Sequence, residues 1–246
     1  MQLPPTDDLR VRQAIIHAVS SEDLVQTVLR GVYPASYQML VRGTKYYDQA
    51  SERYYQPDPA RSRQLLEQAG WRVGPDGIRV REGRRLRVAI ATGTGFVFEA
   101  PVEYVQAKLK EVGVDADVRV IAGAAYIPSL VRPDSEFNMG LIGSFDVDPS
   151  SLLLRFYHSR NYGASNYAHL RNPEIDGLLE RVRSTVNEAE KQRLLTRIQR
   201  FVGEQALVLP LYANASVFAS RSDLQGMQFD PRGNPWFFGV TIGGPR

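Results

Sequence analysis

Residues 86–121 carry the pattern that most restricts the fold of this 246-residue chain, a strand followed by a helix and a second strand. Apolar residues alternate along 86–92, which predicts a strand with a buried face. A helix with one apolar side is predicted over 99–112, and alternation resumes over 114–121. Strands joined in this way pair in parallel with a right-handed crossover. With a third strand predicted over 137–142, we expect an α/β fold whose mainly parallel sheet is flanked by helices.

Helices with clear start and stop signals surround this unit. In "DPARSRQLLEQAGW", Asp58 can cap the amino end, Pro59 suits the first helical position, and Gly70 suits the left-handed residue that ends a helix. "NPEIDGLLERVRS" begins in the same way, with Asn172 as the cap. The apolar run "LVLPLY" at 207–212 predicts a further strand. These helices contain no obvious catalytic residue, which favours a covering role.

A hairpin is predicted over 78–90, where apolar and basic residues alternate. Arg79 and Arg81 would share one face of it. We expect that face to be solvent-exposed, with arginine protecting a sheet edge. The alternative is a basic patch for an anionic partner.

Composition excludes several chemistries. The chain has no cysteine, which rules out disulfides, thiolate catalysis and cysteine-ligated metals. His17, His158 and His169 are far apart in the sequence and lack metal-ligand spacing, so we expect no metal site. We expect no cofactor, and the net charge of +3 argues only weakly for nucleic acid. No apolar run is long enough to span a bilayer, and the opening "MQLPPTDDLR" does not resemble a signal peptide.

The carboxyl ends of the three predicted strands should share one edge of the sheet. Ligands of open α/β sheets bind at this edge, where loops meet and helix N-termini present N–H groups. The predicted loops are 92–96, 122–126 and 143–149. The predicted ligand-binding residues in them are Thr94, Gly95, Phe96, Tyr126, Ser144, Phe145, Asp146 and Asp148.

The two acids of "FDVDP" leave three interpretations open. Asp146 can contact an amine or hydroxyl group of a ligand. Asp148, which precedes Pro149, can cap the next helical turn and hold the loop. The pair also resembles the two carboxylates of a glycosidase. An enzyme would need further catalytic groups that the sequence does not provide, but one short acid pair cannot by itself decide between these interpretations.

Several motifs in one order resemble the bacterial extracellular solute-binding proteins of family five, the oligopeptide-, dipeptide- and nickel-binding group of ABC importers. The first is "DDLRVRQAIIHAVSSEDLVQTVLRGVYPAS", and the second is "YQPDPARSRQLLEQAGW". The third is "NYAHLRNPEIDGLLERVRSTVNEAEKQRLLTRIQRFVGEQALVLPLY". The resemblance covers most of residues 7–240.

This resemblance implies the carboxyl-terminal lobe of a type II periplasmic-binding-protein fold. Residues 1–219 would form the ligand-binding lobe, and the tail 220–246, with Trp236 to Phe238, would belong either to the core or with an amino-terminal lobe absent here. It also implies binding rather than catalysis, and hence no enzyme. The expected partners are a peptide or other small solute and an ABC permease in the membrane, and the expected location is periplasmic or extracellular and membrane-associated. In peptide binders, an acid of the "FDVDP" loop holds the amino group of the peptide. The alternatives are the ligand-sensing domain of a transcriptional regulator and a carboxylate-dependent hydrolase.

Overall fold

The computed structural model describes residues 3–94, 99–143, 148–213, 215, 218–230 and 233–243. At its centre lies a three-stranded sheet in the order β5-β4-β6, formed by β4 (Arg87–Gly93), β5 (Asp115–Ile121) and β6 (Met139–Gly140). Both β5 and β6 pair with β4 in parallel. The predicted α/β fold and all three strand positions are therefore confirmed, although β6 is shorter than expected.

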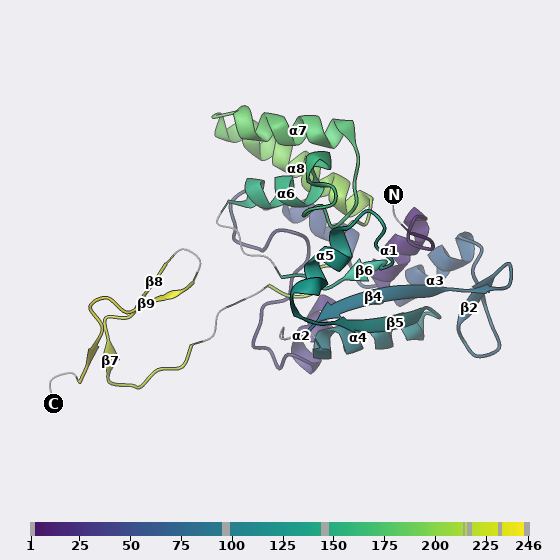
Figure 1. The fold of residues 1–246 in the computed structure, drawn as a ribbon, viewed down its shortest axis with the longest axis horizontal. Coiled ribbons are helices and arrows are strands. Elements are labelled where there is room, and N and C mark those ends of the chain that lie inside the picture. The colour runs from purple at the N-terminus through teal and green to yellow at the C-terminus, as the bar shows by residue number, and fades with distance from the viewer. Residues whose placement is uncertain are drawn as a thin grey trace.

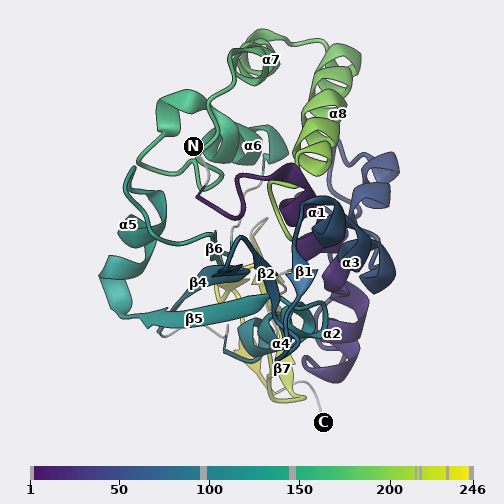
Figure 2. The same ribbon diagram turned by 90° about the vertical axis from the view of Figure 1, so that its right-hand side faces the viewer.

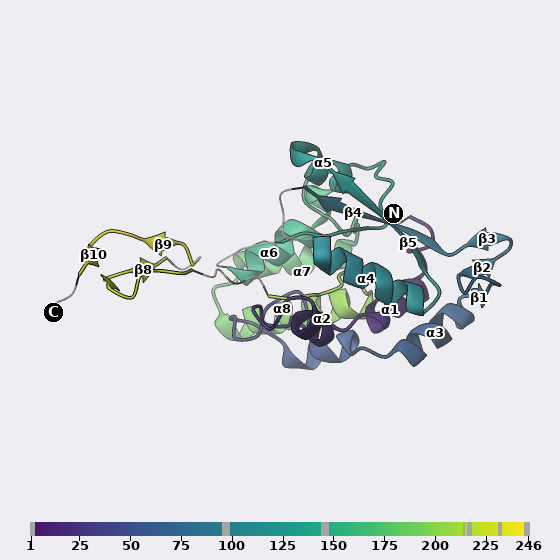
Figure 3. The same cartoon turned by 90° about the horizontal axis from the view of Figure 1, so that it is seen from below.

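Helix α4 (Glu99–Glu111) connects β4 to β5, as the sequence predicted. Figure 3 shows α4, α1 (Leu9–Ala18) and α3 (Pro59–Gln68) on one side of the sheet and α5 (Tyr126–Val131) on the other. Because side chains alternate between the two faces of β4, Val88 and Ile90 pack in the core with α1 and α4, whereas Ala91 packs with α5. The sheet is thus covered on both faces, which parallel strands require.

A second core lies within a helical layer beside the sheet (Figure 1). It is formed by α6 (Pro149–Tyr157), α7 (Pro173–Ser184) and α8 (Glu188–Glu204), together with parts of residues 39–47. The remaining helical elements are α2 (Ser21–Thr27) and the 3₁₀ turns η1 (Gln49–Tyr55), η2 (Gly123–Ala125) and η3 (Ser159–Asn161). The predicted caps are present. Asp58 accepts a hydrogen bond from the N–H of Arg61, and Asn172 accepts two at the start of α7.

The predicted hairpin forms, but one of its arginines does not face solvent. It is a small antiparallel sheet of β1 (Arg72–Val73), β2 (Arg79–Arg81) and β3 (Arg84–Arg85). Arg79 is only 2% exposed. Its guanidinium donates hydrogen bonds to the carbonyl oxygens of Val112 and Trp71, each at 2.9 Å, and lies 3.4 Å from Glu67. The expectation of an exposed Arg79 was wrong because these carbonyl groups need donors, which alternation cannot reveal.

The run 207–212 does not form a strand. Within the described part of the chain, the segment makes a single β-bridge, between Tyr212 and Ala35. The segment follows α8 and passes beside α1 (Figure 2).

The tail projects away from the body of the protein (Figures 1 and 3). Two antiparallel pairs form it, β7 (Leu224–Gln225) with β10 (Thr241–Ile242), and β8 (Gln228–Phe229) with β9 (Pro235–Trp236). Trp236 is 63% exposed and Phe238 is 90% exposed. The tail aromatics therefore do not belong to the core of this lobe. None of the described helices combines the length and apolarity needed to cross a membrane.

Candidate functional site

The carboxyl ends of the three parallel strands lie at one edge of the sheet, which is the geometry that the predicted site requires. The loops after β4 and β5 are joined directly there. The backbone N–H of Thr94 donates to the carbonyl oxygen of Ile121 at 3.1 Å. The N–H of Gly123 donates to the hydroxyl oxygen of Thr94, also at 3.1 Å. Thr94 is exposed, so this edge presents a fixed polar backbone to solvent.

Tyr126 connects the same edge to β6. Its side chain is 1% exposed, and its hydroxyl donates to the carbonyl oxygen of Leu141 and lies 3.2 Å from that of Ala91. Burial raises the pKa of this phenol. Tyr126 therefore holds the ends of β4 and β6 together from within the protein. Its predicted contact with a solute stays a prediction.

Asp148 caps α6. Its Oδ1 accepts hydrogen bonds from the N–H of Ser150 at 2.9 Å and from the Ser150 hydroxyl at 2.8 Å. The hydroxyl of Ser151 lies 3.3 Å from Oδ2. Partial burial raises the pKa of this carboxyl, but the hydrogen bonds from Ser150 outweigh it and leave the pKa lowered. The capping interpretation of Asp148 is thus confirmed. This carboxylate positions the end of the loop.

Five predicted site residues lie outside the described residues: Gly95, Phe96, Ser144, Phe145 and Asp146. Their part in ligand binding stays a prediction.

Sequence reasoning missed one polar group at the end of β4. Thr92 is 1% exposed, and its hydroxyl oxygen is buried without a hydrogen-bond partner in the described part of the structure. Such a group is uncommon in native proteins because it loses its hydration. The signal available was a threonine at the last position of a predicted strand, but threonine is too frequent in strands to be informative.

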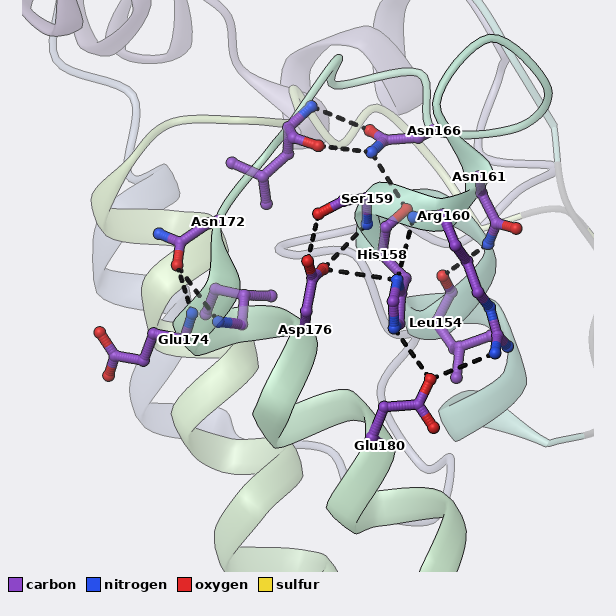
Figure 4. Close-up of polar contacts among 12 residues, drawn as sticks. Leu154, His158, Ser159, Arg160, Asn161, Asn166, Asn172, Glu174, Asp176 and Glu180 are labelled. Carbon is purple, nitrogen blue, oxygen red and sulfur yellow. Dashed lines mark hydrogen bonds and ion pairs between the residues drawn. The ribbon is translucent and has the colours of Figure 1, made fainter.

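Figure 4 shows a second polar cluster, where the end of α6 meets α7. The N–H of Arg160 donates to Nδ1 of His158 at 3.1 Å, so Nε2 carries the proton and donates to Glu180 at 2.9 Å. Asp176 accepts hydrogen bonds from both the N–H and the hydroxyl of Ser159. Because that hydroxyl faces a carboxylate rather than His158, the cluster does not form a serine–histidine nucleophile.

The asparagine that opens the third sequence motif, Asn166, also has a structural role. Asn166 is fully buried and exchanges hydrogen bonds with the backbone of Leu170, at 2.7 and 3.0 Å. The remaining histidines bind backbone oxygens, His169 that of Leu130 and His17 that of Gln56. Among the described residues, no three histidine or acidic side chains are grouped to hold a metal ion.

Comparison with known proteins identifies the family. The model for bacterial extracellular solute-binding proteins, family 5 Middle, matches residues 1–164, which is two thirds of the chain. The chain belongs to this family. The relatives include the oligopeptide-binding protein AppA of Bacillus subtilis, 24% identical over 92% of the chain. The nickel-binding periplasmic protein of Escherichia coli is 26% identical, also over 92%. A probable di/tripeptide-binding protein of Pseudomonas aeruginosa is 29% identical over 98%.

Solved structures of family 5 proteins confirm the periplasmic-binding-protein fold. NikA from Brucella suis, in complex with Fe(III)-EDTA, matches 97% of this chain with a TM-score of 0.81 and 27% identity. AppA from B. subtilis, in complex with a nonapeptide, matches 97% with a TM-score of 0.77 and 20% identity. The chain spans less than half the length of these proteins, 48% of each solved chain and 42–44% of the curated relatives named above.

Proposed function

We propose that this chain is one lobe of the solute-binding component of an ABC importer, and that its solute lies against the carboxyl edge of the β5-β4-β6 sheet. The proposal rests on one observation, the geometry of this edge of the sheet. Three parallel strands end together there, and Thr94, Gly123 and Tyr126 fix their loops. Family membership supports the same role.

In this proposal the second lobe closes over the solute by a hinge motion, as two-lobed binding proteins do. The fixed backbone at Thr94 and Gly123 would receive the solute from one side. Asp146 would supply the charged contact to an amine. Asp148 would not touch the solute, because its oxygens are occupied at the start of α6.

The solute proposed is a peptide or another small molecule with a cationic or hydroxyl group. Relatives are named for oligopeptides, nickel and heme, so the family fold tolerates different solutes. The proposed location is periplasmic or extracellular at the membrane, with an ABC permease as partner. No catalytic step is proposed.

We further propose that residues 220–246 pack on the amino-terminal lobe rather than on this one, so that residues 1–219 form the lobe itself. The support is the exposure of Phe229, Trp236, Phe237, Phe238 and Ile242, each more than half exposed. Exposed apolar groups of this size are typical of a surface that a partner covers.

Two other classes remain as alternatives. A ligand-sensing domain of a regulator would share the fold, and a DNA-binding helix-turn-helix in the same gene would favour it. A carboxylate-dependent hydrolase would use Asp146 and Asp148 as its two carboxylates. The hydrogen bonds that hold the Asp148 carboxylate at the start of α6 disfavour this, because they occupy its oxygens.

Native mass spectrometry of the two-lobed protein containing this chain tests the proposal. We expect a co-purifying peptide or small molecule that the 246-residue chain alone does not retain, since in this proposal the second lobe supplies half of the enclosing surface. Calorimetry with the molecule so identified should give much weaker binding to the isolated chain. Equal affinity for both would contradict the two-lobe site.

A further inference from the structure

Strand β5 forms an open edge of the central sheet. In the order β5-β4-β6, β4 pairs with one side of β5, and no other described strand pairs with its second side. Figure 2 shows β5 along the outer side of β4. The open edge of a strand presents backbone N–H and C=O groups that a further strand can bind.

The hydrogen bonds at the two ends of β5 show which of its backbone groups point away from β4. The N–H of Asp115 donates to the carbonyl oxygen of Leu86, and the carbonyl oxygen of Ile121 accepts from the N–H of Thr94. Successive residues of a parallel strand direct these groups to opposite sides, so the odd-numbered residues of β5 bind β4. The groups that point outward belong to Ala116, Val118 and Val120.

These outward groups have unused hydrogen-bonding capacity. The side-chain amide of Gln106, on α4, donates to the carbonyl oxygen of Ala116 at 2.7 Å, which leaves that oxygen a second lone pair. Among the described residues, none of the backbone hydrogen bonds of loops and turns involves Val118 or Val120. Val120 is also 58% exposed. The edge can therefore accept a strand centred on Val118.

The side chains of β5 complement a second copy of the same strand in one register. When two copies lie antiparallel with Val118 opposite Val118, Ala116 faces Val120 and Asp117 faces Arg119. The even-numbered residues are all apolar and lie on the face where Ala116 is buried in the core and Val118 packs against it. On the other face, opposite charges meet twice, once on each side of the twofold axis.

The adjacent registers lack this complementarity. An axis at residue 117 places Asp117 opposite itself, and an axis at residue 119 places Arg119 opposite itself. Like charges directly opposite each other destabilise a strand pair. In the single chain, Asp117 already accepts a hydrogen bond from Arg119 at 2.9 Å and lies 3.3 Å from Arg87. Exposed ion pairs contribute little energy, so the charges select the register while the backbone hydrogen bonds supply the attraction.

We propose that the open edge of β5 is a self-association surface, at which two copies of this chain pair antiparallel about a twofold axis at Val118. Such a contact is isologous, because each copy presents the same residues to the other. The two Val118 residues exchange both backbone hydrogen bonds, and the pair of Ala116 and Val120 does the same on either side. The central sheets of the two copies then form one continuous sheet.

Sedimentation velocity of the 246-residue chain with two charge-reversal variants tests the proposal. Asp117→Arg makes both pairs across the axis cationic, and Arg119→Asp makes both anionic. We expect the wild-type chain to form a dimer as its concentration rises, and each variant alone to have a dissociation constant at least about tenfold higher. Arg193→Asp, an equal charge change at an exposed position of α8, is the control and should associate as wild type does.

An equimolar mixture of Asp117→Arg and Arg119→Asp restores opposite charges at both pairs. Native mass spectrometry of this mixture should show mainly the heterodimer, because the two variants differ in mass and each repels its own copy. Circular dichroism confirms that each variant is folded. This complementation distinguishes the contact at β5 from association through any other surface, which the mixture would not restore.

Cysteine cross-linking tests the register without altering a charge. The chain has no cysteine, so a single introduced one reports on one position. In the proposed pair, the two Cα atoms at position 118 lie about 5.5 Å apart, which suits a disulfide, whereas those at position 120 lie roughly 14 Å apart. Under mild oxidation, Val118→Cys should form a covalent dimer and Val120→Cys, at the more exposed position, should not.

Three results would overturn the proposal. The first is a wild-type chain that stays monomeric at about 1 mM. The second is association that Asp117→Arg and Arg119→Asp leave unchanged. The third is cross-linking of Val120→Cys at least as fast as that of Val118→Cys, since this would indicate random collision or another register. None of these measurements involves the solute, so the inference is independent of the proposed function.

Discussion

Replacing Asp148 with alanine removes the cap of α6 at the end of the candidate binding loop. The change deletes the acceptor of the Ser150 N–H at 2.9 Å and of the Ser150 hydroxyl. Loss of an N-cap costs about 0.5–2 kcal/mol. Asp148 is exposed, so water can replace part of the lost bonding, and we expect the free energy of unfolding to fall by about 1 kcal/mol. For a chain of this size that corresponds to about 2–4 °C in melting temperature.

The same prediction has a pH dependence. The folded state lowers the pKa of Asp148 below its unfolded value. The contribution of the Asp148 carboxylate to the free energy of unfolding is therefore complete above the unfolded pKa. It is lost as the pH falls through the folded pKa. Urea denaturation should show the full difference between wild type and Asp148→Ala at pH 7, and this difference should begin to shrink only below about pH 4 and shrink further as the pH falls through the lowered folded pKa.

Asp148→Asn is the matched control, because asparagine caps helices as well as aspartate does. It should lose only the charge interaction with the helix, about 0.3–1 kcal/mol, and should show little pH dependence from this site. If Asp148→Ala unfolds at the same urea concentration as wild type at pH 7, the carboxylate does not hold the loop and the capping argument fails.

Three further predictions follow from buried groups, and urea denaturation measures each. Arg79→Met should lower the free energy of unfolding by about 2–4 kcal/mol, because two buried carbonyl oxygens lose their donor; a neutral effect would mean that the desolvation cost of Arg79 cancels its bonds. Tyr126→Phe should cost about 1–2 kcal/mol through the carbonyl of Leu141, and an unchanged midpoint would refute this role. Leu195→Ala, at a fully buried position of α8, should cost about 2–5 kcal/mol; a loss below 1 kcal/mol would show that the helical layer is loosely packed.

Local sequence patterns predicted the β4-α4-β5 unit well, because each strand and the helix has its own periodicity of apolar residues. Strand β4 and helix α4 differ from the predicted ranges by one or two residues. The cap of α3 by Asp58 could also be predicted from the sequence, because capping depends on residues that are neighbours along the chain.

The sequence could not reveal which polar groups form hydrogen bonds with residues far away along the chain. Arg79 is buried because it bonds Val112, which is 33 residues away. The run 207–212 has strand composition but no partner strand among the described residues, and no local pattern can supply that fact. Likewise, the order of strands and loops predicted which edge of the sheet would carry the candidate site. That the Tyr126 side chain is buried could be seen only in the structure.

The most direct test of the central claim, a solute site at the carboxyl edge of the sheet, is calorimetry on the two-lobed protein. The titrant is the peptide or small molecule identified by native mass spectrometry. Asp146→Ala should weaken binding by about 1–3 kcal/mol, which is about 5- to 150-fold in affinity. Asp148→Asn, which keeps the cap of α6, should bind as wild type does. Unchanged affinity in Asp146→Ala, with the protein still folded, would contradict the proposed position of the site.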